Sequence, residues 1–84
     1  MGDARGSVIR ARILQRLDGV EQGNFGKWKG VGEGVCELIF DFGPGYRVYF
    51  GQDGDDVVLL CVGDKSTQGS DIKTAKEYWK DYNA

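Results

Sequence analysis

The clearest structural signal in the sequence is Glu37-Leu-Ile-Phe-Asp-Phe-Gly-Pro-Gly-Tyr-Arg-Val-Tyr-Phe50. Two apolar runs flank a Gly-Pro-Gly turn, in which proline fixes φ and a glycine can adopt a positive φ. The stretch therefore predicts an antiparallel hairpin with strands over 35–42 and 46–51. Side chains alternate between the two faces of a strand. This alternation assigns one set to the core (Cys36, Leu38, Phe40, Phe42, Val48 and Phe50) and another to an open face (Glu37, Ile39, Asp41, Arg47 and Tyr49).

The flanking sequence predicts one further strand and two helices. An Asp-Gly pair within 52–55 predicts a second tight turn, and the apolar run 56–62 predicts the third strand. Apolar residues at three- and four-residue spacing predict an amphipathic helix over 5–20, followed by a long basic loop over 23–34. After a polar loop over 63–69, Ser70 is expected to cap a C-terminal helix whose apolar stripe is Ile72, Ala75, Trp79 and Tyr82.

These elements predict an α+β fold in the order α-β-β-β-α. We expect a three-stranded antiparallel meander with both helices packed on one face, in a single domain over 1–84. The helices are expected to bury Ile13, Leu17, Ile72 and Trp79 against the core face of the sheet.

Composition restricts the class of protein. The chain has 84 residues, of which 40% are hydrophobic and 29% are charged, and it has no apolar stretch long enough to span a membrane. No secretory signal opens it, so we expect a cytoplasmic protein with no membrane partner. The net charge of −2 is unevenly distributed, because residues 1–30 hold six basic and three acidic side chains. An anion-binding surface is therefore expected near the N-terminal helix and the loop after it.

The chain contains no histidine, which removes the commonest general base and histidine-ligated zinc. Cys36 and Cys61 lie in apolar runs without a ligand pattern, so we expect buried free thiols and no metal or other cofactor. Any catalysis must rely on Lys, Arg, Tyr, Asp and Glu.

The hairpin resembles the central hairpin of the RelE/HigB-like toxins of type II toxin–antitoxin systems, the addiction module killer proteins. Their pattern is close to E-L-R-I-x-F-G-P-G-Y-R-V-Y-F. Three more stretches match the same family in the same order: GNFG at 23–26, GEG at 32–34 and VGDKSTQ at 62–68. The resemblance implies a RelE/ParE-like fold that here lacks the usual N-terminal strand, as in a domain truncated at its N-terminus.

The resemblance also implies an activity and partners. Characterised relatives are toxins that inhibit translation by cleaving mRNA on the ribosome, as metal-independent endoribonucleases. The implied partners are a cognate antitoxin of the helix-turn-helix kind, mRNA and the ribosome. Arg47 matches a catalytic, phosphate-contacting arginine, and Lys65 matches the second basic position, after the last strand, so these two are the implied catalytic residues. Lys29 matches a lysine of the loop before Gly32-Glu33-Gly34. At Ile39 the family has an arginine, and we expect this isoleucine to be partly exposed.

Two further RNA contacts are expected from the residues themselves. Tyr49 shares the face of Arg47 and can stack on a base, and Lys27 lies in the basic loop beside Lys29. Each of these candidate residues also has a purely structural interpretation. Tyr49 can pack on the strand surface, Arg47 can pair with Glu37 or Asp41 across the hairpin, and Lys65 can be a solvated loop lysine.

The alternative function is that of a degenerate RelE-fold protein without catalysis, which binds an antitoxin or another protein. Loss of the first strand exposes a sheet edge, which favours association with a partner or self-association. Trp28, Trp79 and Tyr82 are the candidate anchors, although Trp79 and Tyr82 also suit the core as part of the apolar stripe of the C-terminal helix.

Overall fold

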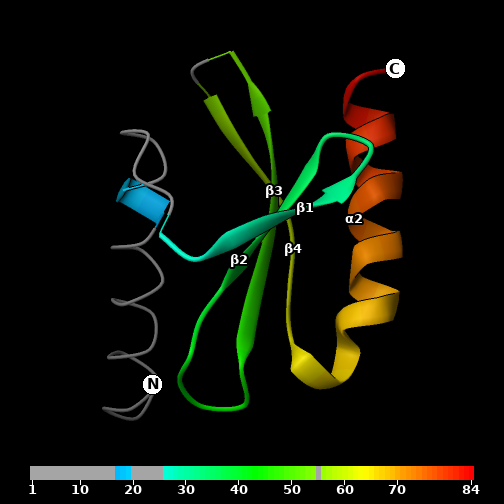
Figure 1. Ribbon diagram of the computed structural model, residues 1–84. Coiled ribbons are helices and arrows are strands. Elements are labelled where there is room, and N and C mark those ends of the chain that lie inside the picture. Colours follow the sequence, from blue (N-terminus) through cyan, green and yellow to red (C-terminus); the bar gives the residue numbers. More distant parts are fainter. Residues whose placement is uncertain (1–16, 20–25, 55) are drawn as a thin grey trace, which may run out of the picture.

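An antiparallel sheet followed by a C-terminal helix makes up most of the computed structural model, which describes residues 17–19, 26–54 and 56–84 (Figure 1). The strands follow one another as β1 (Trp28–Gly32), β2 (Val35–Ile39), β3 (Tyr46–Asp53) and β4 (Asp56–Asp64). A 3-10 turn, η1 (Lys65–Thr67), leads into helix α2 (Gln68–Tyr82). The sheet order is β1-β2-β3-β4. The predicted α+β class is confirmed, but the described sheet has four strands and not three.

Strand β1 lies where a loop was predicted. It pairs with β2, so that Trp28 is opposite Leu38 and Lys29 is opposite Glu37, and the register shifts between Gly30 and Gly32. Glycines are rare in strand interiors and often mark a bulge, which is why the strand pattern is hidden in the sequence. The two residues that join β1 to β2 both have positive φ, as the tightest hairpin turns require.

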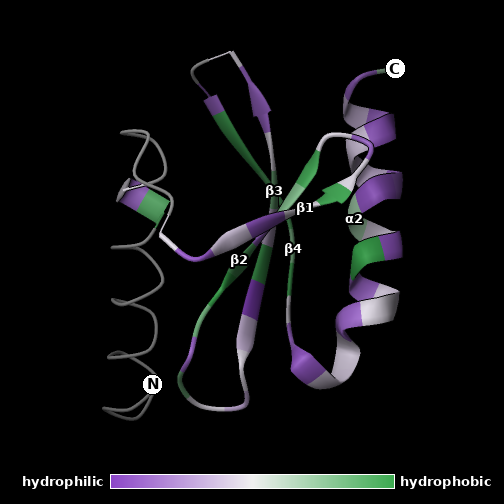
Figure 2. Ribbon diagram, in the orientation of Figure 1, coloured by the Kyte–Doolittle hydropathy of each residue, from purple (hydrophilic) through white to green (hydrophobic). Residues whose placement is uncertain are grey.

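The central strands β2 and β3 are covered on both faces. On one face a cluster of Leu38, Phe40, Val48 and Phe50 is fully buried, and Leu17 packs against it. On the other face Val35, Tyr49 and Ala75 form a second buried cluster, against which Ile72 and Trp79 of α2 pack. Figure 2 shows hydrophobic residues along the central strands, between the helical residues 17–19 and α2.

The prediction that both helices share one face is therefore wrong for the described residues. Residues 17–19 are helical, and Leu17 lies on the face opposite α2 (Figure 1). The rest of the predicted helix over 5–20, including Ile13, lies outside the described residues. The helices lie on opposite faces because β2 and β3 bury side chains on both of their faces. The residues that the alternation assigned to an open face are therefore in large part covered by α2.

Helix α2 begins at Gln68 with Thr67 as its N-cap, so the predicted cap at Ser70 is wrong by three residues and Ser70 lies inside the helix, because η1 already turns the chain within the predicted loop. Its contact with the sheet centres on Trp79. A Cβ on Gly51 of β3 would lie 2.6 Å from two ring atoms of Trp79, so the indole packs directly on the glycine backbone. Trp79 also stacks on Tyr82, with ring centroids 5.3 Å apart and planes at 7°. Close helix–sheet packing thus depends on a glycine in β3.

The two cysteines are free, as predicted, but half-buried. Cys36 packs against the Leu38 cluster and Cys61 against the Tyr49 cluster, and burial raises the pKa of each thiol. Within 17–19, 26–54 and 56–84, no helix has the length and apolar character needed to cross a membrane.

Candidate functional site

A hollow of about 410 Å³ lies at the end of the sheet where β2 turns into β3. The turn takes its shape from Gly43 and Gly45, which have φ of 60° and 77°. Gly45 also leaves room for its neighbours, since a Cβ there would lie 3.3 Å from Cβ of Lys65 and 3.5 Å from Nη1 of Arg47. The two predicted catalytic residues therefore meet in one hollow. Its lining is Phe40, Asp41, Gly43, Pro44, Gly45, Arg47 and Lys65.

Lys65 is held at the rim of the hollow by the capping of η1. The carboxylate of Asp64 accepts hydrogen bonds from the backbone N–H of Ser66 at 2.8 Å and from the Ser66 hydroxyl. These hydrogen bonds lower the pKa of Asp64. The backbone N–H of Asp64 donates in return to Oγ1 of Thr67. Lys65 itself is exposed and forms no ion pair with a described residue, so its ammonium group is available to an anion.

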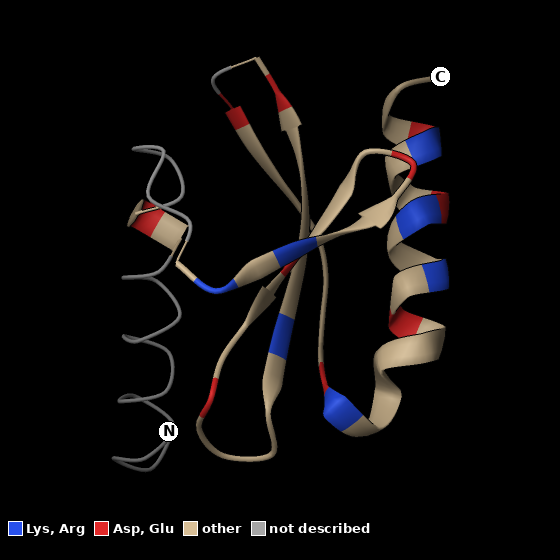
Figure 3. Cartoon of the chain, viewed as in Figure 1, with Lys and Arg blue, Asp and Glu red and all other residues tan. Residues whose placement is uncertain are grey.

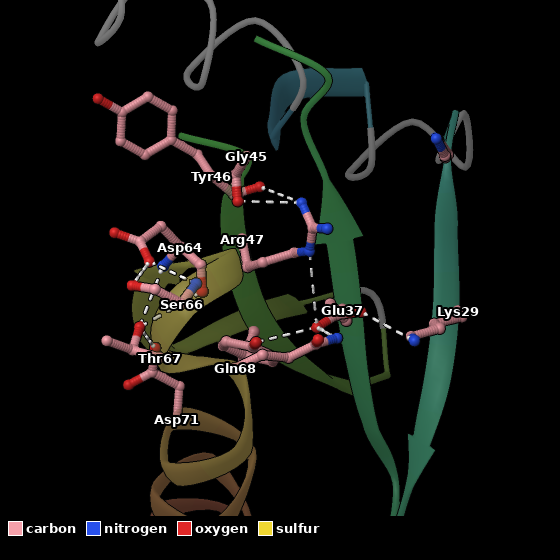
Figure 4. A network of polar contacts seen from close by, with 12 residues as sticks. Lys29, Glu37, Gly45, Tyr46, Arg47, Asp64, Ser66, Thr67, Gln68 and Asp71 are labelled. Carbon is pink, nitrogen blue, oxygen red and sulfur yellow. Dashed lines mark hydrogen bonds and ion pairs between the residues drawn. The ribbon is translucent and has the colours of Figure 1, made fainter. Parts of the chain in front are cut away.

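Arg47 is more constrained than Lys65, because only 13% of its side chain is exposed. Nη1 donates to the carbonyl oxygens of Gly45 at 3.0 Å and Tyr46 at 3.2 Å. Nε lies 4.0 Å from Oε2 of Glu37 and has no hydrogen-bond partner. Arg47 therefore faces a carboxylate on one side and the turn on the other (Figure 4). The ion pair with Glu37, given above as a structural interpretation of Arg47, is present.

Glu37, in the middle of β2, is a fully buried carboxylate and the centre of this network. Oε2 accepts hydrogen bonds from the hydroxyl of Tyr49 at 2.9 Å and from Nε2 of Gln68 at 2.8 Å. Oε1 has no hydrogen bond and lies 3.6 Å from Nζ of Lys29. Burial, together with the hydrogen bond to Glu37, raises the pKa of Tyr49.

The predicted RNA contacts have different outcomes. The placement of Tyr49 on an open face is wrong, because its side chain is 0% exposed beneath α2 and cannot stack on a base there. Lys29 is half-exposed and shares Glu37 with Arg47. Lys27 forms an exposed ion pair with Asp41 at 2.9 Å, and Asp41 lines the hollow. Both lysines thus lie next to the candidate site, each paired with a carboxylate.

Sequence reasoning named Glu37 as a partner of Arg47 but placed it on an open face, and it missed Gln68. The available signal was an acidic residue in the middle of an otherwise apolar strand. A buried charge requires partners, and here they come from β1, β3 and α2.

Charge is mixed at the end of the sheet that holds the hollow. Figure 3 shows basic residues on β1, at the start of β3 and at η1, with acidic residues in the β2–β3 loop and just before η1, and further acidic residues at the tip of the β3–β4 hairpin. The hairpin tip carries Asp53 and Asp56. The hollow therefore combines the two cations Arg47 and Lys65 with the carboxylate of Asp41, on a protein with a net negative charge.

In the part of the chain that the structure describes, no group of three or more Cys, Asp or Glu side chains is placed to hold a metal ion. Cys61 and Asp71 lie close to each other, with Sγ 3.8 Å from Oδ1. The other carboxylate oxygen of Asp71, Oδ2, accepts a hydrogen bond from the hydroxyl of Thr67.

Comparison with known proteins identifies a relative in Haemophilus influenzae. No family model and no solved structure matches the chain. The relative, described as "Uncharacterized protein", is 53% identical over 68 residues, which cover 80% of this chain and 69% of that protein. The similarity therefore extends over most of both proteins.

Proposed function

The chain belongs to the same protein family as this Haemophilus influenzae protein, and we propose that it is the toxin of a bacterial toxin–antitoxin module. The proposed activity is ribosome-dependent, metal-independent cleavage of mRNA in the cytoplasm, which inhibits translation. The proposed partner that restrains it is a cognate antitoxin of the helix-turn-helix kind.

One observation carries this proposal: Arg47 and Lys65, distant in sequence, line the same hollow. A guanidinium and an ammonium group around one hollow suit a phosphate, since charge-assisted hydrogen bonds to phosphate oxygens are among the strongest in proteins. The hollow is open at the surface beside the glycine turn, where a flexible single strand can enter. RelE-like toxins, which the sequence resembles, act on such a strand.

In the proposed reaction the 2′-oxygen of the RNA attacks the adjacent phosphorus and the bond to the 5′-oxygen breaks. Arg47 and Lys65 would contact the phosphate oxygens on which negative charge increases. Asp41 is the carboxylate of the lining and the candidate acceptor of the 2′-hydroxyl proton, while Lys65 can donate a proton to the leaving 5′-oxygen. Lys27 keeps Asp41 in place through its ion pair.

The test is single-turnover cleavage of an mRNA bound to purified ribosomes. Lys65→Ala should slow cleavage by about 10²-fold or more, because a charged contact to the transition state is removed. Lys73→Ala is the matched control, since Lys73 is an exposed lysine of α2 outside the hollow. A wild-type protein that leaves ribosome-bound mRNA intact contradicts the proposal, as does a fully active Lys65→Ala variant.

A second candidate is a non-catalytic RelE-fold interaction protein, and strand β4 favours it. Among the described residues β4 pairs only with β3, which leaves its outer edge open. It also exposes Leu59 and Val62, at 53% and 59% of their surface. An apolar edge strand invites pairing with another chain. Co-purification with an antitoxin, without any cleavage of mRNA by the released protein, would favour this candidate.

A further inference from the structure

The carboxylate of Glu37 is buried between β1, β3 and α2, with no exposed surface. Four groups face it: the phenol of Tyr49, the amide of Gln68, the ammonium of Lys29 and the guanidinium of Arg47. A buried carboxylate is costly to desolvate, and an apolar side chain of similar size often makes a protein more stable at such a position. The stability of the sheet alone therefore does not account for a glutamate here.

The four neighbours of Glu37 act in two different ways. Tyr49 and Gln68 donate hydrogen bonds of 2.9 and 2.8 Å to the same oxygen and so fix the position of the carboxylate. Lys29 and Arg47 lie farther away, at 3.6 and 4.0 Å, on the two oxygens (Figure 4). The carboxylate is held by neutral donors and attracts two cations without forming a close hydrogen bond to either.

This arrangement determines how the guanidinium of Arg47 is oriented. Nη1 is occupied by the carbonyls of Gly45 and Tyr46, and Nε faces Glu37. Nη2 donates to no group among the residues that the structure describes, and it is therefore the nitrogen that remains for an anion. Two cations around one carboxylate also leave the cluster with a net charge of +1, so that it still attracts phosphate.

We infer that Glu37 is the positioning residue of the candidate site: its buried carboxylate orients the Arg47 guanidinium, with Nη2 free for a phosphate of the RNA, and pairs through its other oxygen with Lys29 of β1. This inference rests on the proposed function for the identity of the ligand. Glu37 touches no substrate in this role and acts through the two cations.

The role predicts effects in opposite directions when the charge alone is removed. Glu37→Gln keeps an oxygen that can accept from Tyr49 and Gln68, but it no longer attracts the guanidinium. The cluster then gains positive charge while Arg47 loses its fixed orientation. We expect an RNA oligonucleotide with 2′-O-methyl groups, which cannot be cleaved, to bind two- to five-fold more tightly, whereas cleavage of ribosome-bound mRNA falls at least ten-fold.

The orientation of Arg47 can be measured without any activity. The Nε–H signal of Arg47, assigned in a ¹H–¹⁵N spectrum with Arg47→Lys, should be shifted from the other arginines and slow to exchange with water in the wild type. In Glu37→Gln it should exchange like a solvated arginine. Glu77→Gln is the matched control, because Glu77 is an exposed glutamate on α2. Gln68→Ala, which removes one donor to the carboxylate but keeps its charge, should have an intermediate effect and serves if Glu37→Gln does not fold.

The outcomes separate this inference from the proposed function. An unchanged Arg47 signal in Glu37→Gln and Gln68→Ala overturns the positioning role, whatever the activity. Weaker oligonucleotide binding together with a lower melting temperature assigns Glu37 a structural role only and also overturns it. If the wild type cleaves no mRNA, but the Arg47 signal and oligonucleotide binding change as expected, the positioning role stands and the proposed cleavage fails.

Discussion

Substitution of Gly51 by alanine tests how α2 docks on the sheet. Gly51 is buried in β3 and its φ is not positive, so the backbone accepts alanine and only space opposes it. An added Cβ would lie 2.6 Å from Cε3 and Cζ3 of Trp79, whereas carbon atoms in contact prefer about 3.5–4.0 Å. The indole must therefore move by about 1 Å.

The surroundings of the indole resist this movement. Trp79 stacks on Tyr82, and its Nε1 lies 2.8 Å from where a Cβ on Gly34 would be. Overpacking of this kind costs about 1–3 kcal/mol, and the loss of glycine flexibility in the unfolded chain offsets about 0.4–1 kcal/mol. We expect a net loss of about 1–2 kcal/mol, which lowers the melting temperature of a domain this size by roughly 4–16 °C.

Urea unfolding followed by far-UV circular dichroism measures this loss. Gly30→Ala is the control, because Gly30 is also a strand glycine but has no heavy atom within 4 Å of an added Cβ. It should be as stable as the wild type or slightly more stable. In a Trp79→Leu background the cost of Gly51→Ala should largely disappear. Equal stability of Gly51→Ala and the wild type would show that Trp79 does not pack on Gly51 and that the position of α2 is wrong.

Three further predictions concern the site and its supports. Because burial and Glu37 raise the folded-state pKa of Tyr49 above its unfolded value of about 10, the stability that the phenol contributes is complete below pH 10 and lost as the pH rises above it. Tyr49→Phe should therefore cost about 2 kcal/mol at neutral pH and flatten the alkaline loss of stability, as measured by urea midpoints across pH 7–11. Hydrogen bonds from Ser66 lower the pKa of Asp64, so Asp64→Ala should lower the melting temperature at pH 7. The difference in melting temperature from the wild type should shrink as the pH falls below about 4, because the carboxylate is then protonated. A difference that is the same at every pH would contradict this prediction. Ile39 is half-buried opposite Arg47, and Ile39→Arg should cost under about 1 kcal/mol of stability. The added charge should steepen the salt dependence of RNA binding by about one phosphate contact. A much larger loss of stability would show that the isoleucine side chain is needed in the core.

Local signals in the sequence are sufficient to predict the positions of three of the four described strands. The Gly-Pro-Gly turn and the Asp-Gly pair place β2, β3 and β4 to within a few residues, because turn chemistry fixes where strands end. Strand β1 could not be predicted in this way. Its two glycines contribute no side chains to an alternating pattern, and its pairing with β2 is visible only in the folded sheet.

The candidate site was predicted in part. The resemblance to RelE/HigB-like toxins pointed to Arg47 and Lys65, and both residues line the hollow at one end of the sheet. The face of Tyr49 was assigned wrongly, because an alternation of polar and apolar residues normally marks solvent. Here the polar partner is Glu37, whose charge is balanced by residues from three other elements. Such long-range compensation leaves no pattern in a single sequence.

Every strand of the described sheet pairs with the strand next to it along the chain, and this order has a consequence for folding kinetics. The loops between paired strands are short, so little chain entropy is lost when each hairpin closes. Sheets built from such local pairs fold faster than sheets with long crossings, and stopped-flow refolding is expected on the order of milliseconds. The β2–β3 hairpin, which contributes to both buried clusters, should form first, and α2 should dock last because its contacts require β3 and β4 to be paired already.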